Sequence, residues 1–200
     1  MVRLAISVEG PTEERFVISV LAPYLLARGI FMQPISLGGN VSVDRIKHEI
    51  GKLIYSFDYV TTLYDFYGFR KKAADETKES LEKKIAVGLN HQLSHRFIPY
   101  IQMYEFEALL FTSPEAIGAV FNRDDLVGWA QDILSQFNGN PEAINDSVQT
   151  APSKRFEQHT PYRKTTHGPD IARAIGIDKI RQCCAGFDDW LNCLEGLAKS

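Results

Sequence analysis

The 200-residue sequence predicts an α/β domain with a mainly parallel sheet of about four strands flanked by helices, followed by a helical C-terminal extension. Short apolar runs of strand length alternate with amphipathic stretches of helical period over the first part of the chain. Glycine, proline and polar residues separate these segments. Strands and helices that alternate at such lengths form right-handed β-α-β units with parallel strands.

The N-terminal third predicts two strands and two helices. Residues 3–8 (RLAISV) form a buried strand that ends at Glu-Gly-Pro. A helix follows with Thr12 as its N-cap, is kinked or split at Pro23, and ends at Arg28-Gly29. A second strand and a glycine turn lie within 29–39, and a second helix lies within 42–57.

The next segments complete the sheet. Residues 59–64 (YVTTLY) predict a third strand that ends at Asp65, and 75–89 predict an amphipathic helix. A fourth strand lies within 96–104 (RFIPYIQMY), and a further helical segment, EFEALLF, follows it directly.

Beyond residue 111 the alternation of strands and helices stops. We expect an α/β core over 1–112 and a helical extension over 113–200, packed together as one compact unit. Helices are predicted over 113–137, 169–183 and 186–198. The polar, proline-bearing stretch 138–168 predicts a long loop that is either functional or mobile.

Composition excludes several classes of protein. With 44% hydrophobic and 24% charged residues and a net charge of −3, the chain is typical of globular domains and lacks a wholesale basic surface. Its apolar runs are shorter than the ~20 residues that span a bilayer, and no secretory leader pattern precedes them, so we expect a cytoplasmic protein without membrane contact. The three cysteines lack zinc-ligand spacing. Nucleotide-binding glycine loops and the G-x-S-x-G elbow are also missing from the sequence.

Acidic residues follow three of the predicted strands. Glu9 follows the first, Asp65 the third and Glu105 the fourth. Ligands of open parallel sheets bind at the carboxyl ends of the strands, so these carboxylates are expected to meet at one edge. Carboxylates that gather there repel one another, and a divalent cation with oxygen ligands offsets this cost, which indicates Mg²⁺ or Mn²⁺.

Each acid also has a structural interpretation. Glu13 and Glu14 fall in the first turn of a helix, where negative charge favours the macrodipole. Asp65 is a common turn former, and Glu107 fits a solvent-facing position at a helix start. The agreement of three separate strand ends favours a site for Glu9, Asp65 and Glu105, with Glu13 and Glu107 as supporting ligands.

Basic residues in the late polar stretch are candidates for holding a phosphate. Lys164 is expected to stabilise phosphate charge, and Lys154, Arg155 and His167 are expected to bind substrate. The alternative for Lys154 and Arg155 is a solvated basic loop.

Four segments together resemble a bacterial family of unknown function with a Toprim-like fold, over nearly the whole chain. They are AISVEGPTE, VTTLYDFYGF, FIPYIQMYEFEALLF and the late stretch that runs from PSKRF through PYRKTTHGPDIARAIGIDK to its end. The family looks related to the Toprim nuclease domains of overcoming-lysogenisation-defect proteins and to topoisomerase and primase domains. The resemblance implies metal-dependent phosphoryl transfer on nucleic acid, in phage defence or mobile elements, with an AAA or ABC-type ATPase as a partner.

The resemblance assigns roles to particular residues. Glu9 corresponds to the glutamate after the first strand, and Glu13 completes an E-x-x-x-E spacing. Asp65 corresponds to the first aspartate of a D-x-D motif, but Tyr67 occupies the place of the second. Lys164 corresponds to the late lysine of the nuclease branch.

We therefore expect a Mg²⁺- or Mn²⁺-dependent nuclease with Glu9, Asp65 and Lys164 as catalytic residues. Two alternatives stay open. The missing second aspartate motivates the first, a catalytically degenerate module that binds nucleic acid or an ATPase. The other is a phosphatase that acts on a small substrate. The sequence leaves open the choice between DNA and RNA, the number of metal ions and the oligomeric state.

Overall fold

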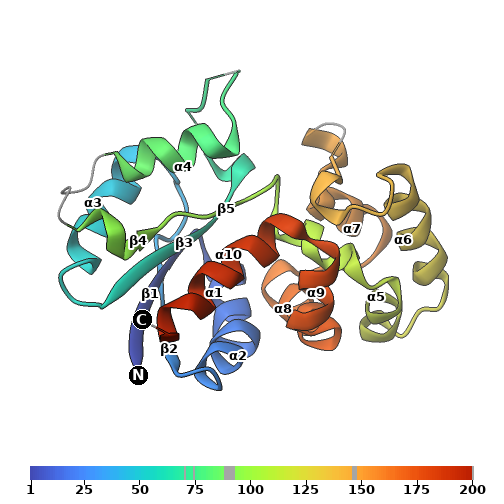
Figure 1. Ribbon diagram of the computed structural model, residues 1–200. Coiled ribbons are helices and arrows are strands. Elements are labelled where there is room, and N and C mark those ends of the chain that lie inside the picture. The colour runs from blue at the N-terminus through green and yellow to red at the C-terminus, as the bar shows by residue number, and fades with distance from the viewer. Residues whose placement is uncertain (70, 74, 88–92, 146–147, 200) are drawn as a thin grey trace.

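The computed structural model describes residues 1–69, 71–73, 75–87, 93–145 and 148–199. A five-stranded sheet lies in it, with the order β2-β1-β3-β4 and with β5 also paired to β3. The strands are β1 (Val2–Val8), β2 (Ile30–Ser36), β3 (Tyr59–Asp65), β4 (Phe97–Ile98) and β5 (Ile101–Gln102). Every strand pair among the described residues is parallel, so the carboxyl ends of the strands share one edge (Figure 1). The predicted fold class is confirmed.

The predicted fourth strand is divided into β4 and β5. Pro99 lacks the N–H that a continuous ladder needs. Thr62 of β3 instead pairs with Tyr100, because its Oγ1 donates to the Tyr100 carbonyl at 2.9 Å and accepts from the Tyr100 N–H at 2.8 Å. The sheet therefore has five strands, where the sequence predicts about four.

The first predicted helix consists of three pieces. These are α1 (Pro11–Phe16), the π-helical segment η1 (Val17–Leu21) and α2 (Ala22–Leu26). The expected split at Pro23 is confirmed, since this residue lies in the first turn of α2, where a missing N–H is tolerated. The prediction of Thr12 as N-cap is wrong: Gly10 is the N-cap, Pro11 begins the helix, and Thr12 is buried inside it.

Helices cover both faces of the sheet. Figure 1 shows α3 (Val43–Leu53) and α4 (Lys78–Ala86) on one side, and α1, α2 and α10 (Ala185–Gly196) on the other. Two clusters of buried side chains correspond to these faces. Ile46 and Tyr64 belong to one cluster, and Ile6 and Leu191 belong to the other. Residues 88 and 89 of the predicted helix 75–89 lie outside the described residues.

The chain after β5 is helical throughout its described part, apart from turns. Its elements are η4 (Phe106–Thr112), α5 (Pro114–Phe121), α6 (Asp125–Gln136), η5 (Pro141–Ala143), η6 (Val148–Thr150), α7 (Pro152–His159), α8 (Lys164–Ile175), α9 (Ile177–Cys183), α10 and η7 (Leu197–Lys199). Short helices η2 (Phe66–Gly68) and η3 (Ser94–Arg96) lie earlier in the chain. Buried residues of β1 and of the late helices belong to one hydrophobic cluster, which includes Ile6, Ile117, Ile171 and Leu194.

The prediction of a long loop over 138–168 is wrong. This interval contains η5, η6, α7 and the first turn of α8. Pro141 and Pro152 begin helices, where proline is favoured, instead of interrupting them. Pro169 likewise lies inside α8. The polar composition of 152–159 does not indicate a helix, and the large side chain that α7 buries is that of Phe156.

We expect Phe156→Ala to lower the free energy of unfolding by about 3–5 kcal/mol, the usual cost of a large cavity in a core. Phe156 is fully buried, and its ring lies 4.9 Å from that of Phe111 and 5.6 Å from that of Trp129. Denaturant unfolding measures the change. The exposed neighbour Gln158, replaced by Ala, is the control and should stay within about 0.5 kcal/mol of wild type. A Phe156→Ala protein as stable as this control would contradict the packing of α7.

Within the described residues, no helix has both the length and the apolar character needed to cross a bilayer.

Candidate functional site

Glu9 follows β1 and lies against η2. Its side chain is half-buried, and its Oε2 atom is shielded from solvent. The backbone of Gly68 approaches so closely that an added Cβ would lie 2.1 Å from Glu9 Oε2 and 2.9 Å from Glu9 Cδ. A glycine at this position therefore leaves the space that the carboxylate occupies.

Glu13 lies in the first turn of α1 and is only 7% exposed. Its Oε2 accepts a hydrogen bond from the Gly10 N–H at 3.0 Å, which closes the start of the helix. Burial raises the pKa of Glu13 to about 7; backbone hydrogen bonds oppose this rise, and the charges of Glu107 and Glu9 add to it. Glu13 is thus a helix cap that also faces other acids.

Asp65 ends β3 at the centre of the acidic group. Its Oδ1 accepts a hydrogen bond from the Phe106 N–H at 2.8 Å, which joins β3 to the start of η4. Burial raises the pKa of Asp65 well above its usual range, and four other carboxylates raise it further. Those four are Glu13, Glu107, Glu9 and Glu105. The other four predicted metal ligands therefore lie within electrostatic reach of Asp65, and we refer to all five acids as the carboxylate cluster.

Glu105 connects the cluster to the C-terminal half of the chain. It is the N-cap of η4, and its Oε2 accepts a hydrogen bond from the Ser153 N–H at 2.8 Å, in the first turn of α7. Tyr104, directly before it, has a left-handed backbone conformation with φ of +61°. This turn directs the chain from β5 toward the edge of the sheet.

Glu107 is the most deeply buried acid of the cluster, at 1% exposure. Its Oε1 accepts a hydrogen bond from the Tyr162 hydroxyl at 3.3 Å and lies 3.5 Å from Lys164 Nζ. Burial raises the pKa of Glu107, and the Lys164 charge opposes the rise. The alternative of a solvent-facing position for Glu107 is wrong, because the η4 segment is buried from Phe106 to Thr112.

Lys164 brings a cation to the cluster from the first turn of α8. Burial lowers its pKa, but the charges of Glu107, Glu105 and Asp65 outweigh this effect and hold the pKa above its usual value. The side chain is 43% exposed, so the ammonium group is charged and open to solvent while it contacts Glu107. A cation in this position is available to an anionic group that approaches the carboxylates.

Three other predicted substrate-binding residues have their contacts away from the cluster. These contacts join Lys154 to Glu157, Arg155 to the Thr150 carbonyl, and His167 Nδ1 to the Arg163 N–H. Their role in binding substrate stays a prediction.

Two residues at the site have no assigned role in the sequence prediction. Gly68 packs on Glu9. The sequence feature that could have identified it is a glycine three residues beyond the end of a strand, where the backbone often approaches another group closely. Tyr162 donates a hydrogen bond to Glu107, and the sequence around Tyr162 is only a polar stretch. No local sequence pattern indicates this hydrogen bond, since it joins residues 55 positions apart.

The donor chemistry of the cluster fits a hard divalent cation. All its side-chain donors are carboxylate oxygens, the ligands that Mg²⁺ and Mn²⁺ prefer. The raised pKa values of Glu13, Asp65 and Glu107 reflect burial and crowding of like charges, which a cation would relieve. Within the described residues, however, no three His, Cys, Asp or Glu side chains are already arranged to hold a metal ion. Binding would therefore require the carboxylates to close around the ion.

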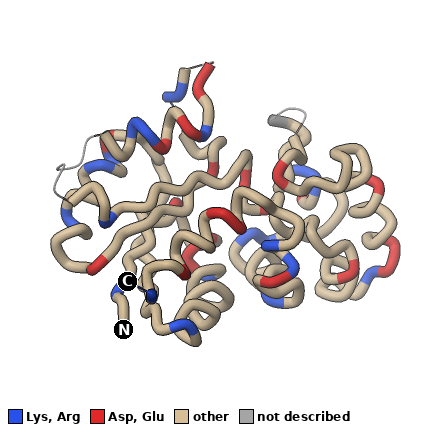
Figure 2. Tube along the Cα trace, viewed as in Figure 1, with Lys and Arg blue, Asp and Glu red and all other residues tan. Residues whose placement is uncertain are grey.

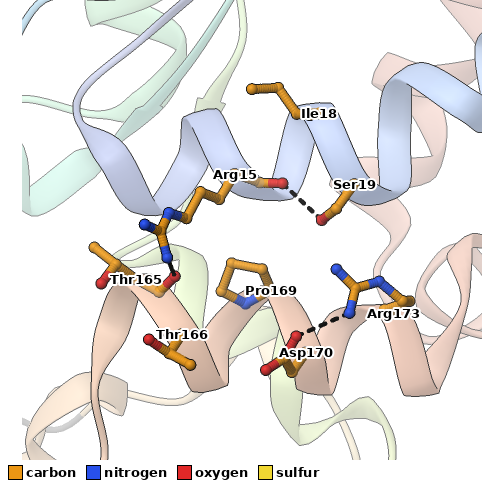
Figure 3. Close-up of a pocket in the computed structure, with 8 residues that line it drawn as sticks. All are labelled: Arg15, Ile18, Ser19, Thr165, Thr166, Pro169, Asp170 and Arg173. Carbon is orange, nitrogen blue, oxygen red and sulfur yellow. Dashed lines mark hydrogen bonds and ion pairs between the residues drawn. The ribbon is translucent and has the colours of Figure 1, made fainter.

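A groove lies between α1, η1 and α8 (Figure 3). Arg15 reaches across it and donates to the Thr165 carbonyl at 2.9 Å, and Arg173 pairs with Asp170 at 2.8 Å. The residues that line this groove do not include the acids of the cluster. Figure 2 shows basic residues interspersed with acidic ones elsewhere, consistent with the net charge of −3.

The comparisons with known proteins agree with the fold. A family model described as "Domain of unknown function (DUF4276)" matches residues 8–195. The C-terminal region of the Burkholderia pseudomallei OLD protein is similar in structure, with a TM-score of 0.55 and 17% identity over 99% of both chains. The corresponding region of the Xanthomonas campestris pv. campestris OLD protein has a TM-score of 0.50 and 14% identity, over 98% of this chain and 96% of the other. No curated protein matches the sequence.

These matches confirm two parts of the resemblance seen in the sequence. They are the likeness to a domain family of unknown function and the likeness to OLD proteins. At identities of 14–17% the structural likeness concerns the fold alone.

Proposed function

The chain belongs to the DUF4276 family, and we propose that it is a Toprim-like, metal-dependent phosphoryl-transfer enzyme, a nuclease that acts on DNA or RNA. The likeness to the C-terminal regions of OLD proteins supports the fold on which this proposal is based. One observation carries it: Glu9 after β1 and Glu105 after β5 lie close enough to Asp65, at the end of β3, for their charges to raise its pKa. Two of the five acids, Glu13 and Glu107, are buried and the other three are half-buried, an arrangement that is unfavourable for a purely structural cluster and that a bound cation would stabilise.

Each residue has a distinct role in the proposed site. Glu9, Asp65 and Glu105 would hold Mg²⁺ or Mn²⁺, with Glu13 and Glu107 in support. The ion supplies Lewis-acid polarisation of a phosphoryl oxygen when it is bound. Lys164 stabilises the negative charge that develops on the phosphoryl group, because its ammonium is solvent-accessible at the rim of the carboxylates. Tyr162 orients Glu107 through their hydrogen bond.

A cleavage assay tests the proposal. Purified protein with Mg²⁺ or Mn²⁺ should nick plasmid DNA or degrade RNA, and Glu9→Gln should abolish this activity because a neutral amide replaces one of the three carboxylates proposed to hold the ion. Glu14→Gln, at the neighbouring first-turn acid of α1, is the matched control and should keep activity. Equal inactivity of wild type and Glu9→Gln on all DNA and RNA substrates would refute the catalytic proposal.

A degenerate binding module is the second candidate, and two observations favour it. Tyr67 stands where the resemblance places a second aspartate, and the described carboxylates are not arranged as a ready metal site. Calorimetric titration with Mn²⁺ in the same experiment separates the candidates. If Mn²⁺ produces a heat of binding with wild type but not with Glu9→Gln, the result supports the enzyme. Identical heats for the two proteins support the binding module. The ATPase partner implied by the resemblance stays a prediction.

A further inference from the structure

Two half-buried tyrosines lie beside the carboxylate cluster. Tyr67 comes two residues after Asp65, and Tyr104 directly precedes Glu105. The Tyr67 N–H donates to the Tyr104 carbonyl at 3.1 Å, and the two ring centroids are 5.5 Å apart with an angle of 43° between the planes. The segments that supply two acids of the cluster therefore also hold two aromatic rings together next to it.

The backbone at Tyr104 indicates that this ring has a particular use. Its φ of +61° lies in the left-handed region, which a bulky side chain seldom adopts and which glycine or asparagine adopts more easily. The other described non-glycine residues with positive φ are Asn40, Asn122 and Asn138. Strained conformations of this kind are concentrated at functional sites, so an aromatic residue here points to a role for the ring itself.

A cation lies near the rings of Phe66 and Tyr67. Lys72 Nζ is 5.0 Å from the ring centroid of Phe66 and 5.3 Å from that of Tyr67. The aromatic surface thus has a positive charge beside it, and the chain segments that form it also supply Asp65 and Glu105. Aromatic surface next to positive charge is complementary to a nucleotide, which combines an aromatic base with an anionic phosphate.

We propose that Tyr67 and Tyr104 form a stacking platform for an unpaired nucleobase, with Lys72 beside the phosphate that follows it. The inference rests on the proposed function, since the base belongs to the strand whose phosphate lies at the carboxylate cluster. It adds that the substrate is single-stranded where it is bound, because both faces of a base inside a duplex are covered by the neighbouring base pairs. Tyr67 would therefore contact a base from the position at which the resemblance places a second metal-binding aspartate.

Fluorescence anisotropy with a labelled single-stranded oligonucleotide of about 12 nucleotides tests this proposal, a length within single-strand site sizes. Ca²⁺ replaces Mg²⁺, and an abasic oligomer of equal length and a blunt duplex are the comparison probes. Tyr67→Ala and Tyr104→Asn should each weaken binding of the single strand by about 5- to 150-fold, the equivalent of about 1–3 kcal/mol per stacked base. Asparagine suits the left-handed backbone, so Tyr104→Asn removes the ring without adding strain.

Controls separate stacking from general effects. Tyr67→Phe keeps the ring and should bind as wild type does. Tyr55→Ala removes a tyrosine that is 72% exposed at the opposite end of β3, and it should change nothing. The abasic oligomer and the duplex should bind weakly to wild type and equally to all variants.

The outcomes also distinguish this inference from the proposed function. Equal binding of the abasic and normal strands by wild type, or full affinity in Tyr67→Ala, would overturn the platform even if cleavage is observed. Base-dependent binding that the two variants lose would support the platform even if no metal-dependent cleavage is found.

Discussion

Gly68→Ala is expected to reduce metal-dependent cleavage by about 100-fold while the protein stays folded. The new Cβ would lie 2.1 Å from Glu9 Oε2, and ordinary contact begins near 3.4 Å, so the carboxylate has to move by more than about 1 Å. A misplacement of about 1 Å in a catalytic group costs on the order of 100-fold in rate. Because the displaced atoms are the end of a flexible side chain, the fold itself has no reason to change.

The measurement combines a cleavage rate with a melting temperature. Gly128→Ala is the matched control, since its added Cβ would meet no atom within 4 Å and the residue lies inside α6. Alanine is favoured over glycine in a helix, so the control should be active and slightly more stable. Full activity of Gly68→Ala would show that the position of the Glu9 carboxylate is irrelevant to the reaction.

The second large effect is a loss of stability as pH rises, which Mg²⁺ should reverse. The folded pKa of Glu13 is about 7, above the value of 4.5 for an unperturbed glutamate, and the pKa values of Asp65 and Glu107 are also raised. The folded state therefore binds more protons than the unfolded state between these values. Its stability is greatest below about pH 4.5 with respect to these groups and falls as the pH rises through about 7.

The magnitude follows from the shift. One pKa unit corresponds to about 1.4 kcal/mol, so the rise of Glu13 alone represents on the order of 3 kcal/mol, shared with the acids that titrate together with it. Lys164 does not reverse the sign in this window, because its raised pKa affects stability only in the alkaline range.

Denaturant unfolding between pH 4.5 and 8, with and without Mg²⁺, measures the effect. Without the ion, wild type should lose stability across this range, and Glu13→Gln should flatten the slope. Mg²⁺ should stabilise wild type more at pH 8 than at pH 5, since cation binding requires ionised carboxylates. A flat profile for wild type, or equal stabilisation at both pH values, would contradict a buried cation-binding cluster.

Much of the fold could be predicted because the relevant signals are local. The apolar run before Glu9 and the β-branched run before Asp65 identify β1 and β3 wherever the rest of the chain lies. The failure at 138–168 has the opposite cause. Helix α7 packs through one large apolar side chain, Phe156, among polar residues, and the burial of that side chain depends on the aromatic residues of other segments that surround it.

For the candidate site, too, local patterns predict some features and the surrounding structure determines the others. Strand ends and parallel pairing place Glu9, Asp65 and Glu105 at one edge, and both are readable from residue patterns. Local pattern also places Glu13 at the start of a helix. Its pKa of about 7, however, results from burial and from the charges of Glu107 and Glu9, which depend on the tertiary structure.

The sequence by itself determined the order of strands and helices and the edge at which the acids gather, because periodicity and strand boundaries are properties of neighbouring residues. Only the tertiary structure decided that Lys164 and Tyr162 meet Glu107, that Gly68 presses on Glu9, and that Tyr67 pairs with Tyr104. These contacts join segments far apart in the chain. They depend on how α8 packs against η4 and on how the segments that follow β1, β3 and β5 meet, which local patterns do not encode.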